Sequence, residues 1–268
     1  MSQAFQLSTR RACKLVGLAS STRYYHSHCS RDDTTLQAVI RAVCAAKVRY
    51  GRPRVIWHVR EVLHMPDNHK RIGRVYCELG LQIGKRPHSK RQRSGLRLVL
   101  ERPTQPNHTW AMDFVSDQLA SSRRFRCLTV TDLYTHESPT ITVDVSLTGA
   151  RVAQVLDGLK ATRGLPKQIV CDNGPEFTSR ALEQWAMANA VLLRFIQPGK
   201  PNQNAYCEAF NARLRDECLN VHWFGNLPAA QAQIEDWRIE FNTERPHSSL
   251  ANKTPKQFAQ EHYDRVAA

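Results

Sequence analysis

Apolar and polar positions alternate along the second half of the chain, beginning near residue 109. Bulky apolar side chains stand at 110, 112 and 114, with Asp113 between them. This pattern predicts a strand whose carboxylate points away from the bulky groups. Two further β-rich runs, at 125–134 and 138–145, complete a predicted meander of three antiparallel strands.

After the meander, helical and extended patterns alternate. Ser146 is a predicted N-cap, and Gly164 a predicted end, of the first helix in this part. The predicted elements are a helix from Leu147 to about Arg163, a strand from Lys167 to Cys171, a helix near 178–190, a strand at 191–196 and a long helix at 202–220. This order predicts an α/β fold of the ribonuclease-H-like type, in which a five-stranded mixed sheet carries helices on both faces.

The first half of the chain has helical periodicity instead. Ser8 is a predicted N-cap of a short helix that ends at Gly17, and a second short helix begins at Ser20. The pair fits a helix-turn-helix, although an ordinary αα-hairpin has the same pattern. Further helices are predicted at 34–48, 53–65 and 68–80, the last with Asn68 as its N-cap.

Charge divides the chain at almost the same place. Residues 1–105 hold 21 Lys and Arg against 6 Asp and Glu, a formal charge of +15, whereas residues 106–268 hold 17 against 18, a charge of −1. A basic half joined to a near-neutral half indicates a module that binds a polyanion, and nucleic acid is the polyanion that Lys and Arg bind through phosphate contacts. The alternative is a basic surface that only keeps the protein in solution.

Basic residues on the predicted helices and on the tract between Gly84 and Gly95 are candidates for phosphate contacts. That tract is rich in Lys and Arg and poor in apolar residues, so it is predicted to be a linker that follows the DNA backbone. The candidates in the first half are Arg10, Arg11, Lys70, Arg71, Arg74, Lys85, Arg86, Lys90, Arg91 and Arg93.

Cysteine usage and hydropathy point to a reduced, membrane-free environment. The eight cysteines form no Cys-x-x-Cys pair, and several lie in apolar runs, as buried thiols of a cytoplasmic protein do. The start of the chain has no apolar signal-peptide core, and no run of about 18 apolar residues occurs. His26, His28, Cys29 and Cys44 can be drawn as a zinc site, but their spacing fits no standard pattern.

Three carboxylates carry the candidate chemistry. Asp172 ends an apolar strand and opens an Asp-Asn-Gly-Pro turn, and Glu208 lies 36 positions later in a predicted helix. With Asp113, these residues could hold two Mg²⁺ ions, with Mn²⁺ as an alternative, for phosphodiester transfer. Taken singly, each also fits an ordinary structural carboxylate. The rivals for the first position are Asp117, Asp132 and Asp144, of which Asp132 also lies in an apolar strand pattern.

The helix that carries Glu208 supplies further candidates. Asn204, Asn211 and Arg215 lie at helical spacing from Glu208 and should share its face, where they could contact DNA. Tyr206, Phe210 and Leu214 should line the opposite, core-facing side. Lys200 lies in a Pro- and Gly-containing loop that leads into this helix and could reach DNA.

With these segments in place, residues 109–258 resemble the integrase core of DDE transposases, most closely the second-frame transposase of the IS-three family of bacterial insertion sequences. The front half resembles the helical region of the same family more loosely, through Tyr50–Arg54 and Asn68–Arg71. The matching core segments are Trp110–Phe114, Cys171–Phe177, Pro198–Asn202, Glu208–Cys218, Phe241–Leu250 and Thr254-Pro255.

The resemblance implies a triad of Asp113, Asp172 and Glu208 with Arg215 at the family's Lys/Arg position, and it leaves Asp132 outside. It implies Mg²⁺-dependent cutting of a DNA 3′ end and joining of that end at the terminal inverted repeats. The chain departs from the family at Asn202-Gln203, Ala212 and His136, and it lacks the zinc-binding domain of retroviral integrases.

The expected organisation is a basic helical DNA-binding region (1–84), a basic linker (85–105), a catalytic core (106–220) and a helical extension that packs on the core (221–268). The expected partners are double-stranded DNA, further copies of the chain and a protein from an upstream reading frame. The expected location is the bacterial cytoplasm, at the nucleoid when DNA is bound. A nuclease of the same fold that never joins ends, an inactive DNA-binding remnant and a retroelement integrase are the alternatives.

Overall fold

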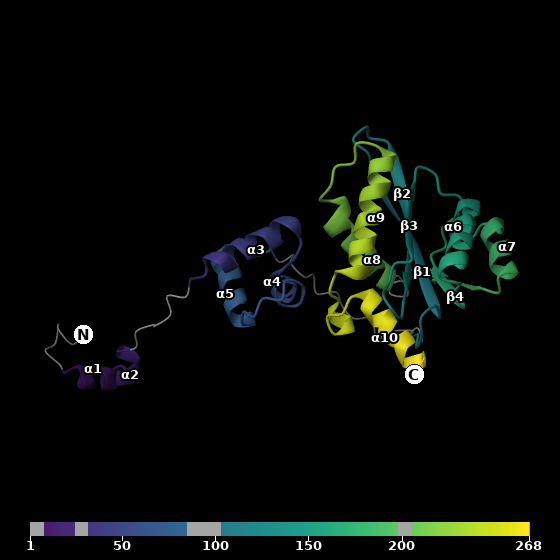
Figure 1. Cartoon of the computed structure of the whole chain (residues 1–268). Helices are drawn as coiled ribbons and strands as arrows, with labels where there is room; N and C mark the ends of the chain where they lie inside the picture. The colour runs from purple at the N-terminus through teal and green to yellow at the C-terminus, as the bar shows by residue number, and fades with distance from the viewer. Residues whose placement is uncertain (1–7, 25–31, 85–102, 198–204, 268) are drawn as a thin grey trace.

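The computed structural model describes residues 8–24, 32–84, 103–197 and 205–267 (Figure 1). Its centre is a five-stranded sheet in the order β3-β2-β1-β4-β5. Strands β1, β2 and β3 pair antiparallel as a meander, and β4 and β5 join parallel to β1. The strands are β1 (Thr109–Gln118), β2 (Arg124–Asp132), β3 (Thr140–Asp144), β4 (Gln168–Cys171) and β5 (Leu192–Phe195). The predicted mixed sheet is confirmed.

Helices cover both faces of the sheet, as Figure 1 shows. On one face lie α6 (Gly149–Thr162) and α7 (Arg180–Ala188). On the other lie α8 (Ala205–Leu214), its π-helical continuation η3 (Arg215–Leu219) and α9 (Leu227–Thr243). The short η4 (Ser248–Leu250) and α10 (Pro255–Ala267) complete the chain.

The alternation along β1 divides the core between these two faces. Trp110 and Met112 pack with the apolar residues of α6 and α7, whereas Val115 packs with Phe210 and Leu214 on the other side. Because successive strand residues point to opposite faces, Asp113 must face the α8 side. The predicted direction of its side chain is therefore confirmed.

The described residues of the first half, 8–24 and 32–84, form helices, as predicted. A small core of its own, which includes Ile40, Val55 and Ile72, holds α3, α4 and α5 together. Ser8 and Asn68 cap their helices through their side chains, as expected. The elements are α1 (Thr9–Leu15), α2 (Ser20–Arg23), α3 (Thr34–Ala46), α4 (Arg52–Trp57), the π-helical η1 (His58–Val62) and α5 (His69–Glu78).

Ion pairs connect this helical unit to the other half. The Lys47 ammonium lies 2.7 Å from Glu240 of α9. The Arg54 guanidinium lies 2.9 Å from Glu217 of η3, which is only 11% exposed. Glu217 also pairs with Arg245, so the Arg54–Glu217 contact belongs to a network that joins the two halves.

Two details of the prediction are wrong. The helix expected from Leu147 begins at Gly149, with Thr148 rather than Ser146 as its N-cap. Gly149 packs so closely that an added Cβ would lie 1.8 Å from the Ser179 hydroxyl oxygen, so this position accepts only glycine. In the C-terminal extension, which is expected to pack on the core, Trp237 is buried there but Trp223 is 85% exposed.

The described cysteines are Cys13, Cys44, Cys77, Cys127, Cys171, Cys207 and Cys218, and each is a free thiol, as predicted. Within the described ranges, no helix has the length and apolar character needed to cross a membrane. Three members of the drawn zinc set, His26, His28 and Cys29, lie outside the described residues, and Cys44 lies in α3.

Candidate active site

Asp113 lies in the middle of β1, on the face covered by α8. The backbone N–H of Phe114 donates to its Oδ1 at 2.7 Å, and the side-chain amide of Asn211 donates to its Oδ2 at 2.8 Å. Each carboxylate oxygen thus has one donor, which fixes the orientation of the group and leaves further lone pairs free for a cation.

Asn211 orients this carboxylate from α8. It is 9% exposed, and its Oδ1 accepts from the Thr129 hydroxyl at 2.9 Å. Thr129 stands directly opposite Asp113 in the β1–β2 register. The sequence places Asn211 on the correct helical face but assigns it to DNA. In the structure, the buried amide bonds to Asp113.

Asp172 follows β4 and begins a tight turn. Its Oδ1 accepts from the backbone N–H of Gly174 at 3.0 Å. A Cβ at Gly174 would lie 3.0 Å from that oxygen, which is closer than nearly all real contacts, so glycine lets the turn close against the carboxylate. The Asp-Asn-Gly-Pro signal therefore holds a carboxylate at the end of a parallel strand.

Electrostatics connect the three predicted carboxylates. Burial raises the pKa of Asp113, and the negative charges of Asp172 and Glu208 raise it further, against the lowering by its hydrogen bonds. Like charges have this effect only at short range. Glu208 itself is exposed in the first turn of α8.

The chemistry of this donor set fits a hard divalent cation. Mg²⁺ prefers a few carboxylate oxygens and keeps several waters, and its positive charge would offset the repulsion around Asp113. Within the part of the chain that the structure describes, no three His, Cys, Asp or Glu side chains already converge as a finished metal site. The carboxylates are neighbours that a cation would draw together.

The rival carboxylates have other partners. Asp132 is 1% exposed and accepts from three backbone N–H groups and from the Arg163 guanidinium. Asp117 and Asp144 each accept from the backbone N–H of the next residue. Asp132, the most serious rival on sequence, therefore has its acceptor capacity used within the fold.

A second layer, which the sequence did not reveal, supports the Asp172 turn. The Arg126 guanidinium of β2 pairs with Glu176 and lies 4.0 Å above the centre of the Phe114 ring. This ion pair lowers the pKa of Glu176. Phe114 also stacks on Phe177, with ring centroids 4.9 Å apart. The contacts tie residues 174–177 to the strand that carries Asp113.

Comparison with known proteins agrees with this architecture. Two family models, both described as integrase core domain, match residues 103–201 and 189–255. The chain is 46% identical over 260 residues to the insertion element IS407 uncharacterized 31.7 kDa protein of Burkholderia multivorans, covering 96% of this chain and 92% of the relative. The chain belongs to the DDE-type insertion-sequence transposases.

A more distant relative is also an insertion-sequence transposase, and one solved structure shares the fold of this chain. The transposase for insertion sequence element IS904 of Lactococcus lactis is 24% identical over 227 residues, which cover 79% of this chain and 88% of the relative. A chain in the cryo-EM structure of the simian T-cell lymphotropic virus intasome, in complex with PP2A regulatory subunit B56 gamma, superposes with a TM-score of 0.54. It is 17% identical and covers 82% of this chain and 74% of that chain, which shows a common fold.

The transposase's predicted DNA contacts differ in their surroundings. Arg10, Arg11 and Lys70 are exposed. Arg71 pairs with Asp33 and Asp67, and Arg74 pairs with Asp33 and Glu78, so phosphates would have to compete with carboxylates for these two. The remaining first-half candidates, Lys85, Arg86, Lys90, Arg91 and Arg93, and the loop candidates Lys200 and Asn204, lie outside the described residues.

The structure places two further residues of the Glu208 helix. Arg215 is exposed, and its guanidinium donates to the Ser116 carbonyl at 3.0 Å, so it is anchored beside β1. Tyr206, predicted to face the core, is 49% exposed. The prediction for Tyr206 is wrong because the first turn of α8 borders a cavity rather than packed side chains.

Proposed function

We propose that this transposase cuts the 3′ ends of its insertion sequence at the terminal inverted repeats and joins them to target DNA. One observation carries the proposal. Asp113 is buried, oriented by Asn211, and close enough to Asp172 and Glu208 for their charges to raise its pKa. A protein maintains such repulsion at a binding site for cations more readily than in a structural core.

Each carboxylate has a part in this mechanism. Asp113, Asp172 and Glu208 would hold two divalent cations, Mg²⁺ or Mn²⁺. When bound, such cations activate the attacking oxygen and stabilise the leaving oxygen of a phosphodiester. Asn211 keeps Asp113 in one orientation, and the Arg126–Glu176 pair stabilises the turn that presents Asp172.

The basic first half would hold the DNA. Residues 1–84 would bind the transposon ends and 85–105 would connect them to the core at 106–220, with 221–268 packed on it. The charge of +15 on residues 1–105 supports this division. Arg10, Arg11 and Lys70 are exposed candidates, and Arg215 contacts Ser116 of β1, the strand that carries Asp113. Further copies of the chain and an upstream-frame protein would complete the assembly on DNA.

A joining assay tests the proposal. The full-length protein, with Mg²⁺ and duplex DNA that carries the element's terminal sequence, is compared with Asp172→Asn and Glu208→Gln. Asp117→Asn is the matched control, because Asp117 lies on β1, on the same face as Asp113, and contacts its own neighbour. Loss of joined product in the two site variants alone supports the proposal. Cleavage without joining would indicate a nuclease, and binding without chemistry a DNA-binding remnant.

A further inference from the structure

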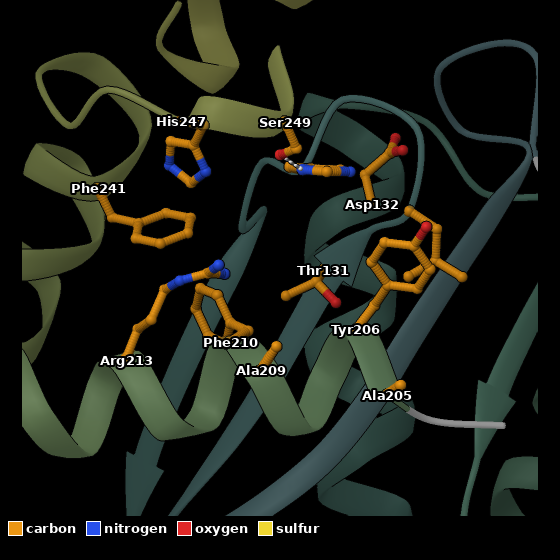
Figure 2. Close-up of a pocket in the computed structure, with 12 residues that line it drawn as sticks. Thr131, Asp132, Ala205, Tyr206, Ala209, Phe210, Arg213, Phe241, His247 and Ser249 are labelled. Carbon is orange, nitrogen blue, oxygen red and sulfur yellow. Dashed lines mark hydrogen bonds between the residues drawn. The ribbon is translucent and has the colours of Figure 1, made fainter. Parts of the chain in front are cut away.

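A separate cavity lies on a different face of α8 from Asn211. It occupies about 270 Å³ between α8, the end of β2 and the segment 241–249 (Figure 2). Ala205, Ala209 and Arg213 recur every four residues along α8, so they share the face that borders it. Glu208 does not line the cavity, but it is the helical neighbour of Ala205 at three residues' spacing, so it lies next to the cavity's edge.

Flat aromatic side chains form much of the cavity wall. Figure 2 shows Tyr206 on one side and Phe241, with Phe210 below it, on the other. Ala209 lies between them on α8, and its small side chain leaves the space open. Aromatic walls of this kind accept a planar ring by stacking.

Arg213 supplies an unused donor. Within the described residues, no hydrogen bond or ion pair reaches its half-buried guanidinium, and burial lowers its pKa. Its neighbour Arg245 is different, because Glu217 accepts from Arg245 at 2.7 Å and from Arg54 at 2.9 Å. A partly buried cation without a partner is costly, so its retention indicates a ligand.

His247 supplies an unused acceptor. It is 4% exposed, and its buried Nε2 has no hydrogen-bond partner among the described residues. Burial lowers the pKa of His247 to about 3, helped by the positive charges of Arg245 and Arg213, so the ring is neutral near pH 7. A neutral imidazole has one ring nitrogen without a hydrogen, so the buried ring can accept a hydrogen bond.

A donor and an acceptor between aromatic walls match the edge and faces of a nucleobase better than they match an inorganic anion. A phosphate needs donors only, and the nearby Asp132 carboxylate and neutral His247 would not attract it. We propose that this cavity receives a nucleobase turned out of the DNA helix next to the cleavage point. The proposal rests on the proposed function, because the base must come from DNA held at Glu208.

Substitution of Arg213 separates a ligand role from a structural role. Arg213→Met removes an unpartnered charge, so the free protein should keep or raise its thermal midpoint. Arg245→Gln is the contrast: it breaks a buried pair with Glu217 and should lower the midpoint by several degrees. A large fall in the midpoint of Arg213→Met would overturn the proposal by showing that the charge stabilises the fold.

The decisive measurement combines variants of the pocket with variants of the DNA. The experiment compares full-length wild-type protein with Arg213→Met and with a control, Arg151→Gln, whose exposed side chain lies on α6. Each protein is mixed with terminal duplexes that carry either 2-aminopurine or an abasic nucleotide. The modified nucleotide is moved through successive positions around the cleavage point. We expect 2-aminopurine fluorescence to change on protein binding at one position only. We expect Arg213→Met to slow joining of intact DNA about tenfold, and only about twofold or less where that same base is absent.

Three results would contradict the inference in distinguishable ways. Normal joining by the wild type with no fluorescence change at any position overturns the base pocket and leaves the proposed function intact. A defect of Arg213→Met that is equal on intact and on every abasic duplex also overturns the pocket. Failure of the wild type to cut or join any terminal duplex overturns the proposed function, and the pocket with it.

Discussion

Two aspartates on adjacent strands of one sheet have opposite surroundings. Asp132 at the end of β2 is fully buried, with three backbone donors and Arg163 at 3.2 Å. Asp113 in β1 has two donors, and the nearest charges that raise its pKa are carboxylates. Both residues interrupt apolar runs, so hydropathy alone does not separate them.

The difference separates a charge that is compensated within the fold from one that we propose binds a cation. Asp132 organises the turn after β2 and fixes Arg163, which also contacts Glu137 at 2.6 Å. Its charge is compensated inside the protein. Around Asp113 the compensation is incomplete, so the proposed binding of a cation from solution would lower the free energy of the folded protein.

The largest expected effect is the loss of catalysis when the uncompensated site is altered. Asp172→Asn and Glu208→Gln each remove a proposed cation ligand, and the loss of about 4 kcal/mol of transition-state stabilisation corresponds to about a 10³-fold slower joining rate. Joined product is measured by gel, and circular dichroism and DNA binding are measured alongside. Wild-type rates in both variants would show that these carboxylates are not ligands.

Substitution of Asp132, whose charge is compensated, should lower the stability of the protein rather than its activity. Asp132→Asn leaves Arg163 short of one partner in a buried network, which should cost about 3 kcal/mol and lower the thermal midpoint by about 6 to 12 °C. Joining at low temperature should stay within a few-fold of wild type. Asp144→Asn is the control, because its carboxylate is half-buried and accepts from the backbone N–H of Val145. Full stability with no joining would reverse the assignment of the two aspartates.

Substitution of Asn211 should slow joining by less than substitution of Asp172 or Glu208 does. Asn211→Ala should leave Asp113 without its oriented donor, reduce joining about 10- to 100-fold and raise the Mg²⁺ concentration needed for half-maximal rate. The Mg²⁺ titration is the informative measurement, because a merely structural role would lower the amount of folded enzyme without moving the Mg²⁺ midpoint. Asn220→Ala, exposed just after η3, is the matched control.

The smallest expected effect is the thermal stabilisation of the protein by Mg²⁺ bound at Asp113. At about ten times its dissociation constant, Mg²⁺ should stabilise the protein by about 1.4 kcal/mol and raise the thermal midpoint by about 3 °C. Asp113→Asn should lose this shift, and Asp132→Asn should keep it from its lower starting midpoint. Equal shifts in both variants would place the cation elsewhere.

Local patterns account for much of the architecture. The alternation around Asp113, the Gly turn after Asp172 and the caps at Ser8 and Asn68 depend on neighbouring residues, so the sequence predicts them. The start of α6 was misplaced because Thr148 and Ser146 are both good caps. Only the contact of Gly149 with Ser179, thirty positions away, decides between them.

The sequence by itself determined the order of strands and helices, the basic first half and the three candidate carboxylates, because periodicity, charge and motif spacing are properties of the chain. The tertiary structure decided which polar groups are already used. It paired Asp132 with Arg163 and Asn211 with Asp113, and among the described residues it left the Arg213 guanidinium and the His247 Nε2 without a hydrogen-bond partner. Hydrogen bonds and desolvation depend on what lies across the sheet, and that proximity is fixed only when the chain has folded.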